Sequence, residues 1–263
     1  MAERKRMLLV GETWVSAATH FKGFDQFGSA TFHSGAGPLI AALQGSRFDL
    51  VHMPAHEAVE AFPFDLAGLS HYDAILLSDI GANSLLLHPQ VWLHGNPVPN
   101  RLRLLRDWTH AGGGLAMIGG YLSFQGIDGR ARWHRTPVED ALPVTCLPTD
   151  DRIEVPEGFR AVVVQPDSPI LAGVPADWPL LLGANEVVLR PEAQAGCIAR
   201  LPPDYGGHPL LVTGRHGHGR TAVWTSDLSP HWLPKSFSDW PGYAVLWRNI
   251  LGWLADPGDD AAQ

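Results

Sequence analysis

Short segments that are apolar throughout, separated by segments with helical spacing, constrain the fold of this chain more than any other feature. Four apolar segments lie at 6–12 (RMLLVGE), 48–54 (FDLVHMP), 72–81 (YDAILLSDIG) and 114–120 (GLAMIGG). Helical segments lie between them at 37–46, 57–63 and 100–114. Strands without polar alternation belong to a parallel sheet that helices cover on both faces. The sequence therefore predicts an α/β protein with a mostly parallel central sheet.

The second half of the chain is richer in strand signals. They lie at 159–165, 185–190, 196–201, 208–217 and 219–228. The last two segments flank Gly217-His218-Gly219 and predict a hairpin. An amphipathic helix over 238–256 closes the chain. We expect one domain over residues 1–256, with extra strands in its C-terminal half, and a disordered tail over 257–263.

Composition and charge narrow the classes of partner. The net charge of −8 disfavours a nucleic-acid surface, because phosphate binding needs a basic patch. The arginines near 101–106 are interpreted as a solvated helix face. No apolar run approaches the roughly 20 residues of a membrane span, and the apolar run after the basic start is too short for a signal peptide. Cys146 and Cys197 suit a reducing compartment. We expect a cytoplasmic protein that binds neither nucleic acid nor membrane.

Polar side chains follow four of the predicted strands. They are Glu12 and Thr13, Ser78 and Asp79, Tyr121 and Ser123, and finally Ser226, Asp227 and, after Pro230, His231. Ligands of open α/β sheets bind beyond the carboxyl ends of the strands, so these residues are expected to converge on one pocket. The alternative is that each is a cap or turn residue, since Asp, Ser and Gly favour such positions for backbone reasons.

The segment 19–27 (THFKGFDQF) is interpreted as a loop after the first strand. A long glycine-containing loop over a strand end is suited to be a lid or a substrate contact. His20 and Lys22 are therefore candidate substrate-binding residues, together with Asp79 and Ser123. A contact between subunits of a homo-oligomer is the alternative for this loop.

Five segments carry a resemblance to a known family. They are GETWVSAATHFKGFDQF, DAILLSDIGANSLLLHP, PNRLRLLRDWTHAGGGLAMIGGYLSFQGIDG, RTPVEDALPV and VWTSDLSPHW. Together they resemble the glutamine amidotransferase-like family, a bacterial group within the class I glutamine amidotransferase superfamily that is related to the ThuA-like proteins. The resemblance runs from about residue 8 to residue 254. It implies a flavodoxin-like three-layer sandwich.

The chain departs from that family pattern at the catalytic turn. The resemblance implies a G-x-C-x-G turn after the fourth strand, whose cysteine attacks the glutamine amide with help from a late histidine and glutamate. The matching stretch is Gly119–Ser123, and Tyr121 stands at the cysteine position. A phenol with a pKa near 10 is a poor nucleophile at neutral pH. We expect Tyr121 at a strand-to-helix turn, with its hydroxyl in a cleft, and no glutaminase activity.

Metal binding is weighed on two histidine patterns. Asp227 and His231 are four residues apart and form either a metal-binding pair, an acid–histidine couple, or an N-cap with a packed histidine. His216 and His218 can share a strand face, but the surrounding glycines favour an exposed turn. The carboxylates of Glu12, Asp79 and Asp227 would repel one another if they converge. We expect no cofactor, and either a weakly bound divalent metal ion or at least one raised carboxylate pKa.

Three functions follow. The first is an enzyme that acts on a small polar molecule, sugar-like or an amide, with Tyr121, His231, Asp227 and Glu12 as catalytic residues. The second is a non-catalytic small-molecule-binding or scaffold protein on the same fold. The third is a genuine glutamine amidotransferase with an unrecognised nucleophile. In each case the expected partners are a small-molecule ligand and further copies of the chain.

Overall fold

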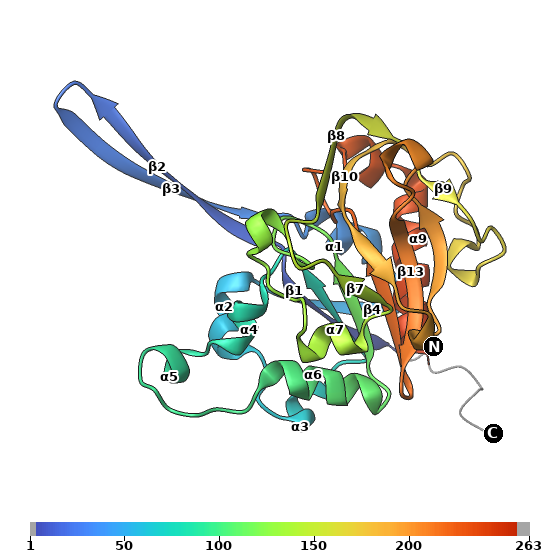
Figure 1. Ribbon diagram of the computed structural model, residues 1–263, viewed down its shortest axis with the longest axis horizontal. Helices are drawn as coiled ribbons and strands as arrows, with labels where there is room; N and C mark the ends of the chain where they lie inside the picture. Colours follow the sequence, from blue (N-terminus) through green and yellow to red (C-terminus); the bar gives the residue numbers. More distant parts are fainter. Residues whose placement is uncertain (1–3, 257–263) are drawn as a thin grey trace.

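The computed structural model describes residues 4–256, and the tail expected to be disordered at 257–263 lies outside them. The described chain is built on an eight-stranded sheet (Figure 1). In spatial order its strands are β4 (Phe48–Met53), β1 (Lys5–Gly11), β5 (Ala74–Ser78), β6 (Gly114–Ile118), β14 (Gly219–Trp224), β13 (Pro209–His216), β12 (Gly196–Arg200) and β9 (Val162–Val163).

The first five strands of that order are parallel to one another. If these five strands are numbered in chain order, their order across the sheet is 2-1-3-4-5. This is the flavodoxin-like order, whose switch point lies between β1 and β5. The remaining strands β13, β12 and β9 continue the sheet in antiparallel pairs. The predicted α/β flavodoxin-like fold is therefore confirmed, together with the extra strands in the C-terminal half.

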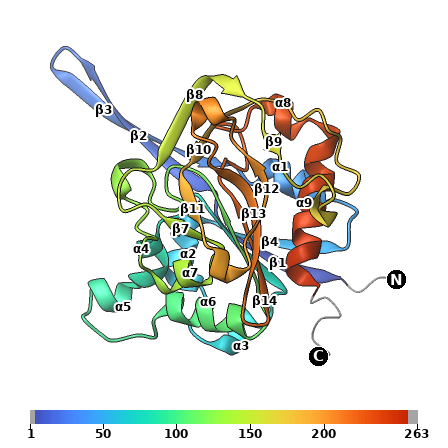
Figure 2. The ribbon, with the colours of Figure 1, turned by 45° about the vertical axis from the view of Figure 1, so that its right-hand side comes forward.

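Helices cover both faces of the sheet (Figures 1 and 2). On one face α1 (Gly37–Leu43) and α9 (Pro241–Ala255) pack over Met7 and Leu9 of β1. On the other face lie α2 (Ala55–Ala61), α4 (Ala82–Leu86), α6 (Arg101–His110) and α7 (Pro137–Ala141), packed over Leu8 and Val10. Successive strand residues point to opposite faces, so a strand buried on both sides has to be apolar throughout.

Smaller elements complete the described chain. Two antiparallel strand pairs stand apart from the main sheet: β7 (Val144–Cys146) with β11 (Val187–Leu189), and β8 (Arg152–Phe159) with β10 (Leu181–Asn185). The short helices are α3 (Leu66–Leu69), α5 (Pro89–Trp92) and α8 (Lys235–Ser238), with 3₁₀ turns η1 (Ile127–Gly129), η2 (Pro169–Leu171), η3 (Pro191–Ala193) and η4 (Pro203–Tyr205). Within residues 4–256, no helix is long and apolar enough to cross a membrane.

The segment interpreted as a loop is the end of a long β-hairpin. Strand β2 (Thr13–Lys22) pairs over its whole length with β3 (Asp25–Ser34), and the hairpin projects from the body (Figure 1). Gly23 has a φ of 65°, as a tight two-residue turn can require of its first residue. The loop interpretation was wrong because the hairpin has no buried face, so its sequence lacks the apolar alternation of a half-buried strand.

Arg101 corrects a second expectation. Its side chain is buried rather than solvated, and its guanidinium donates hydrogen bonds to the carbonyl oxygens of Leu85, Val59 and Phe62. These carbonyls lie at or near the ends of α2 and α4, where helical carbonyls lack intrahelical partners. Burial lowers the pKa of Arg101 to about 10, so the guanidinium stays charged at neutral pH.

Candidate functional site

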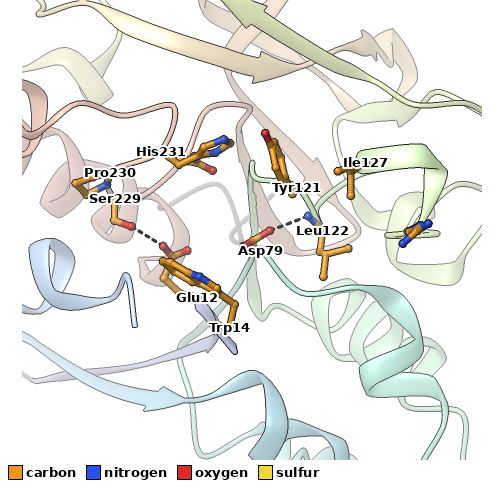
Figure 3. Close-up of a pocket in the computed structure, with 11 residues that line it drawn as sticks. Glu12, Trp14, Asp79, Tyr121, Leu122, Ile127, Ser229, Pro230 and His231 are labelled. Atoms are coloured by element: carbon orange, nitrogen blue, oxygen red, sulfur yellow. Dashed lines mark hydrogen bonds and ion pairs between the residues drawn. The ribbon is translucent and has the colours of Figure 1, made fainter. Parts of the chain in front are cut away.

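The carboxyl ends of β1, β5, β6 and β14 surround one cavity of about 590 Å³. It is lined by Glu12, Trp14, Asp79, Tyr121, Leu122, Ile127, Arg130, Asp227, Ser229, Pro230 and His231 (Figure 3). Five residues expected to converge, Glu12, Asp79, Tyr121, Asp227 and His231, are thus brought together. The cavity lies at the carboxyl ends of β1 and β5, the pair at which the strand order reverses, which is the switch point of the sheet.

The backbone is unusual at two of these strand ends. Glu12 directly follows β1 with a φ of 53°, and Asp79 directly follows β5 with a φ of 43°. Left-handed conformations of non-glycine residues cost on the order of 1–3 kcal/mol, and they concentrate at functional sites. The backbone N–H of Glu12 donates to the carbonyl oxygen of Ser78 at 2.7 Å, which holds the two strand ends together. The fold thus holds two acids in strained positions beside one cavity.

Glu12 is a buried acid with two serine partners. The Ser78 hydroxyl donates to Oε2 at 2.5 Å, and the Ser229 hydroxyl donates to Oε1 at 2.9 Å. Burial raises the pKa of Glu12 to about 7; the charges of Asp79 and Asp227 also raise it, and the serine hydrogen bonds oppose them. Glu12 can therefore gain or lose a proton near neutral pH.

Asp79 faces the same cavity from the end of β5. Its Oδ1 atom accepts a hydrogen bond from the backbone N–H of Leu122 at 2.7 Å (Figure 3). Burial raises the pKa of Asp79 to about 6 against the effect of that hydrogen bond. A Cβ atom at Gly120 would lie 2.8 Å from Oδ1 of Asp79 and 3.0 Å from Oδ1 of Asp227, so only glycine lets both carboxylates approach the turn.

Asp227 and His231 form an acid–histidine couple after β14. Nδ1 of His231 lies 2.8 Å from Oδ2 of Asp227, and the same oxygen accepts the backbone N–H of Trp232 at 2.7 Å. Burial lowers the pKa of His231, but the hydrogen bond and the charge of Asp227 outweigh burial, so the pKa is raised. The imidazole lies against Tyr121, with ring centroids 4.3 Å apart. Because Nδ1 is bonded to the carboxylate, Nε2 is the nitrogen left for a ligand.

The turn after β6 is held by a network that sequence reasoning missed. Asn185 accepts the backbone N–H of Gly120 at 3.0 Å and donates to its carbonyl oxygen at 3.2 Å. It also donates to Asp151 at 2.8 Å, and Asp151 accepts the backbone N–H groups of Gln125 and Gly126. No α-helix starts at this turn: the described chain continues through Leu122–Gly126 into η1. The expected strand-to-helix elbow is therefore replaced by a strand-to-loop turn.

Tyr121 presents its ring, rather than its hydroxyl, to the acids. The hydroxyl points away from Asp79 and Glu12 in Figure 3. Its hydrogen-bond partners are Glu154 and Arg152, and the Arg152 guanidinium lies 5.1 Å from the ring centroid. Burial and Glu154 raise the pKa of Tyr121 above its ordinary value. The phenol is thus less easily ionised than a free tyrosine, which disfavours it as a nucleophile.

Three candidate substrate-binding residues lie elsewhere. Ser123 is buried beneath the turn, where its hydroxyl donates to the Ile118 carbonyl oxygen at 2.5 Å and accepts the Asp79 N–H at 3.1 Å. This role in the turn replaces the expected place in the pocket. His20 and Lys22 lie near the tip of the projecting hairpin and do not line the cavity of their own chain. Conversely, Trp14 and Ser229 line the cavity without having been predicted as site residues.

The other histidines and the two cysteines considered as metal ligands or nucleophiles lie outside the cavity. Across the described part of the chain, no group of three or more His, Cys, Asp or Glu side chains could hold a metal ion. His216 and His218 lie at the predicted β13–β14 hairpin turn, with both rings against His110. Cys146 and Cys197 are buried, and burial raises the pKa of each thiol. Neither cysteine is therefore an activated nucleophile.

Comparisons with known proteins place the chain in a family. The family model described as "Putative glutamine amidotransferase" matches residues 6–256. A cytoplasmic protein from Salmonella typhimurium is similar at 40% identity and a TM-score of 0.89, over 95% of this chain and 98% of the other. A second one, from Salmonella typhimurium LT2, is similar at 37% identity and a TM-score of 0.88, over 95% and 100% of the two chains.

A more distant comparison supports the fold alone. A ThuA-like protein from Bacteroides uniformis is 11% identical with a TM-score of 0.58, over 96% of this chain and 92% of the other. None of the curated proteins compared with the chain matches it. The family model and the two Salmonella relatives cover nearly the whole described chain. The chain therefore belongs to the glutamine amidotransferase-like family that its sequence segments resemble.

Proposed function

We propose that this protein is an enzyme that performs acid–base chemistry on a small polar molecule, sugar-like or an amide, at the cavity around Glu12 and His231. The observation that carries the proposal is one buried carboxyl group with a pKa of about 7 and one Asp-paired imidazole in the same cavity. A catalytic acid or base works best when its pKa lies near the working pH. Glu12 meets that condition at the end of β1, and the Asp227-paired His231 faces the same cavity from the segment after β14.

The two groups suit different roles. The hydrogen bond and the charge of Asp227 raise the pKa of His231 and favour its protonated form, in which Nε2 carries a proton that can be delivered into the cavity. Glu12, at the midpoint of its titration, can accept a proton from the substrate. Asp79 orients the turn through Leu122 and adds a hydrogen-bond acceptor to the cavity wall. The wall therefore has acceptors for hydroxyl or amide N–H groups and an acid–base pair for the reaction itself.

Size and surface favour a small, polar substrate. A cavity of about 590 Å³ lies within the range of small-molecule sites. Its carboxylates accept hydrogen bonds, whereas Trp14 and Tyr121 offer ring faces on which the apolar face of a sugar ring can stack. Tyr121, in the position of the family's nucleophile, speaks against glutamine hydrolysis by the family mechanism.

The experiment is a binding and turnover screen. Wild type, Asp227→Asn and the matched control Asp140→Asn, an exposed aspartate on α7, are titrated calorimetrically with neutral sugars, sugar acids and amides that include glutamine. Mixtures that bind are then followed by proton NMR for new products. Binding and turnover that Asp227→Asn loses and Asp140→Asn keeps support the enzyme. Binding without turnover favours the binding protein, and ammonia from glutamine favours the amidotransferase.

The two cysteines and the two Salmonella relatives bear on the cellular compartment of the protein. We infer a reducing cytoplasmic compartment, because both cysteines are free thiols in the described structure and the two similar Salmonella proteins are called cytoplasmic. A weakly held divalent ion at Asp227 and His231 stays a prediction. Calorimetric titration of the same three proteins with divalent metal salts tests it.

A further inference from the structure

Beyond its base, where the Phe32 ring lies edge-on to His56 of α2, the β2–β3 hairpin projects from the body as a ribbon. Every residue from Trp14 to Phe32 is exposed. Of the sixteen large hydrophobic side chains exposed within residues 4–256, six lie on this ribbon: Trp14, Val15, Phe21, Phe24, Phe27 and Phe32. An isolated two-stranded hairpin is marginally stable at best in water, and concentrated exposed apolar surface marks an interaction site. The ribbon therefore has the features of an interaction surface.

Both faces of the ribbon have large residues towards their ends and small residues between them, and one face borders the cavity. Cross-strand pairs share a face, so the face that carries Trp14 of the cavity wall consists of Trp14–His33, Ser16–Thr31, Ala18–Ser29, His20–Phe27 and Lys22–Asp25. Ring side chains lie at the base and near the tip of this face, and small residues lie between them. A face with large residues at both ends and small residues between them is self-complementary when two ribbons cross antiparallel. The base of each ribbon then contacts the tip of the other, and the small central residues of both ribbons meet at the two-fold axis.

Charge also favours a second copy. The whole chain carries −8, so two bodies repel, whereas the ribbon's only formally charged residues are Lys22 and Asp25. A crossing through the face of Trp14 and His33 brings no like charges together, because each Lys22–Asp25 pair lies at the opposite end of the crossing from the partner's pair. The tip also complements its destination, since Lys22 and His20 would approach a cavity that holds Glu12, Asp79 and Asp227.

Geometry fixes where each tip arrives. The base of the ribbon borders the cavity, because Thr13 follows Glu12 directly and Trp14 lines the wall. An antiparallel crossing that sets a tip on the partner's base therefore sets that tip at the partner's cavity. A face about 33 Å long and about 10 Å wide buries only on the order of 700 Å² for two ribbons, below the roughly 1,200 Å² of a stable interface. Phe24 and Phe27 near the tip, against Trp14 and Leu122 at the cavity rim, supply further area.

We propose that the β2–β3 hairpin is an exchanged arm: in a two-fold dimer of this chain, two hairpins cross through their Trp14–His33 faces, and each tip closes the other copy's cavity. The site of each copy is completed by its partner's tip, including the partner's Lys22. This inference does not rest on the proposed function, since it concerns association alone.

The test uses two matched alanines in the full chain. Ala18→Glu adds a charge at the crossing face, whereas Ala30→Glu adds the same charge to the opposite face, and both residues are exposed in one chain. Sedimentation velocity should show a dimer for wild type and Ala30→Glu and a monomer for Ala18→Glu, with equal far-ultraviolet circular dichroism. A monomeric wild type, or equal assembly of the two variants, overturns the proposal.

A second measurement places the tip. Lys22→Cys with Leu122→Cys in one chain should give a disulfide-linked dimer on oxidation, because Leu122 lies at the cavity rim while Lys22 of the same chain is at the far end of the hairpin. Lys22→Cys with Leu93→Cys, an exposed leucine beyond α5, is the control and should stay unlinked. Absence of linkage in the first pair, or equal linkage in both, overturns the closing of the cavity by the partner's tip.

Discussion

Oδ2 of Asp227 lies 2.8 Å from Nδ1 of His231 and also accepts the backbone N–H of Trp232, so one carboxylate oxygen fixes both the imidazole and the segment that carries it. The couple keeps the proton of His231 on the nitrogen that faces Asp227 and leaves Nε2 for the cavity. This hydrogen bond joins two residues four positions apart in the segment that follows β14, so its geometry is set mainly by that segment.

Asp227→Asn should lower the pKa of His231. The variant removes the charge and the charge-assisted hydrogen bond that outweigh burial in raising this pKa. NMR titration of the His231 ring protons measures the shift, with Asp140→Asn as the control that should leave it unchanged. An equal His231 pKa in wild type and Asp227→Asn contradicts the assigned pairing.

Glu12→Gln should flatten the dependence of stability on pH. The folded pKa of Glu12 is raised to about 7 from 4.5, so the folded state binds the proton more tightly than the unfolded chain does. The stabilisation is complete below pH 4.5 and is lost as the pH rises to about 7, which amounts to on the order of 3 kcal/mol. Asp79, raised to about 6, contributes with the same sign.

Urea unfolding of wild type and Glu12→Gln between pH 4.5 and 8 measures this difference. The variant should gain relative to wild type as the pH rises, since it has no charge to bury. Glu57→Gln, an exposed glutamate on α2, is the control and should follow the wild-type curve. Parallel curves for wild type and Glu12→Gln would show that folding does not raise the pKa of Glu12.

Gly35→Ala should disturb the site from the end of the hairpin. A Cβ atom at Gly35 would overlap the Glu12 carboxylate and the Ser229 hydroxyl, which hydrogen bond to each other at 2.9 Å. We expect a loss of about 1–3 kcal/mol in the free energy of unfolding, in the range of overpacked sites. Gly37→Ala, two residues on, meets no atom within 4 Å and should cost nothing measurable. Equal stability of the two variants would contradict the close approach at Gly35.

Asn185→Ala should loosen the turn that carries Tyr121. It leaves the peptide groups of Gly120 and one oxygen of Asp151 without their amide partner, at about 1–3 kcal/mol for each buried group left unsatisfied. Chemical denaturation measures the loss. Asn249→Ala removes an amide that donates to Ile170 and Ala172 far from the cavity, so it should lower stability without changing ligand affinity. Unchanged affinity in Asn185→Ala would separate the turn from binding.

Glutaminase activity should be absent. Tyr121 holds the family's cysteine position, and both native thiols are buried with raised pKa values. Ammonia release from glutamine is measured with wild type and with a Cys146→Ser, Cys197→Ser double variant. Turnover that the double variant abolishes would reveal a nucleophile that the structure does not indicate.

Most of the sheet could be predicted from the sequence, and part of the site followed from it. The strands β5 and β6 and the C-terminal parts of β1 and β14 are almost entirely apolar because both of their faces are covered, and parallel strands end at one edge. That rule alone placed Glu12, Asp79 and His231 near one another. It could not place Ser123, whose hydroxyl is turned to the Ile118 carbonyl by the local path of the turn.

Other parts of the site had no local signal. Asn185 and Asp151 approach Gly120 from β10 and from the residue before β8, strands whose antiparallel pairing is irregular and outside the main sheet. The hairpin was missed because no core selects its side chains, although Gly23-Phe24 between residues rich in aromatic and β-branched side chains was the turn signal that could have revealed it.

Both legs of the hairpin end on Glu12. Thr13 follows it along the chain, and Gly35, one residue after β3, donates its N–H to the Glu12 carbonyl oxygen at 2.9 Å while its Cα packs on the carboxylate. No linker absorbs movement between the ribbon and this acid. A rotation of the hairpin about its base therefore moves Glu12, whose backbone is already left-handed. A contact that fixes the hairpin also fixes the position of the Glu12 carboxyl group.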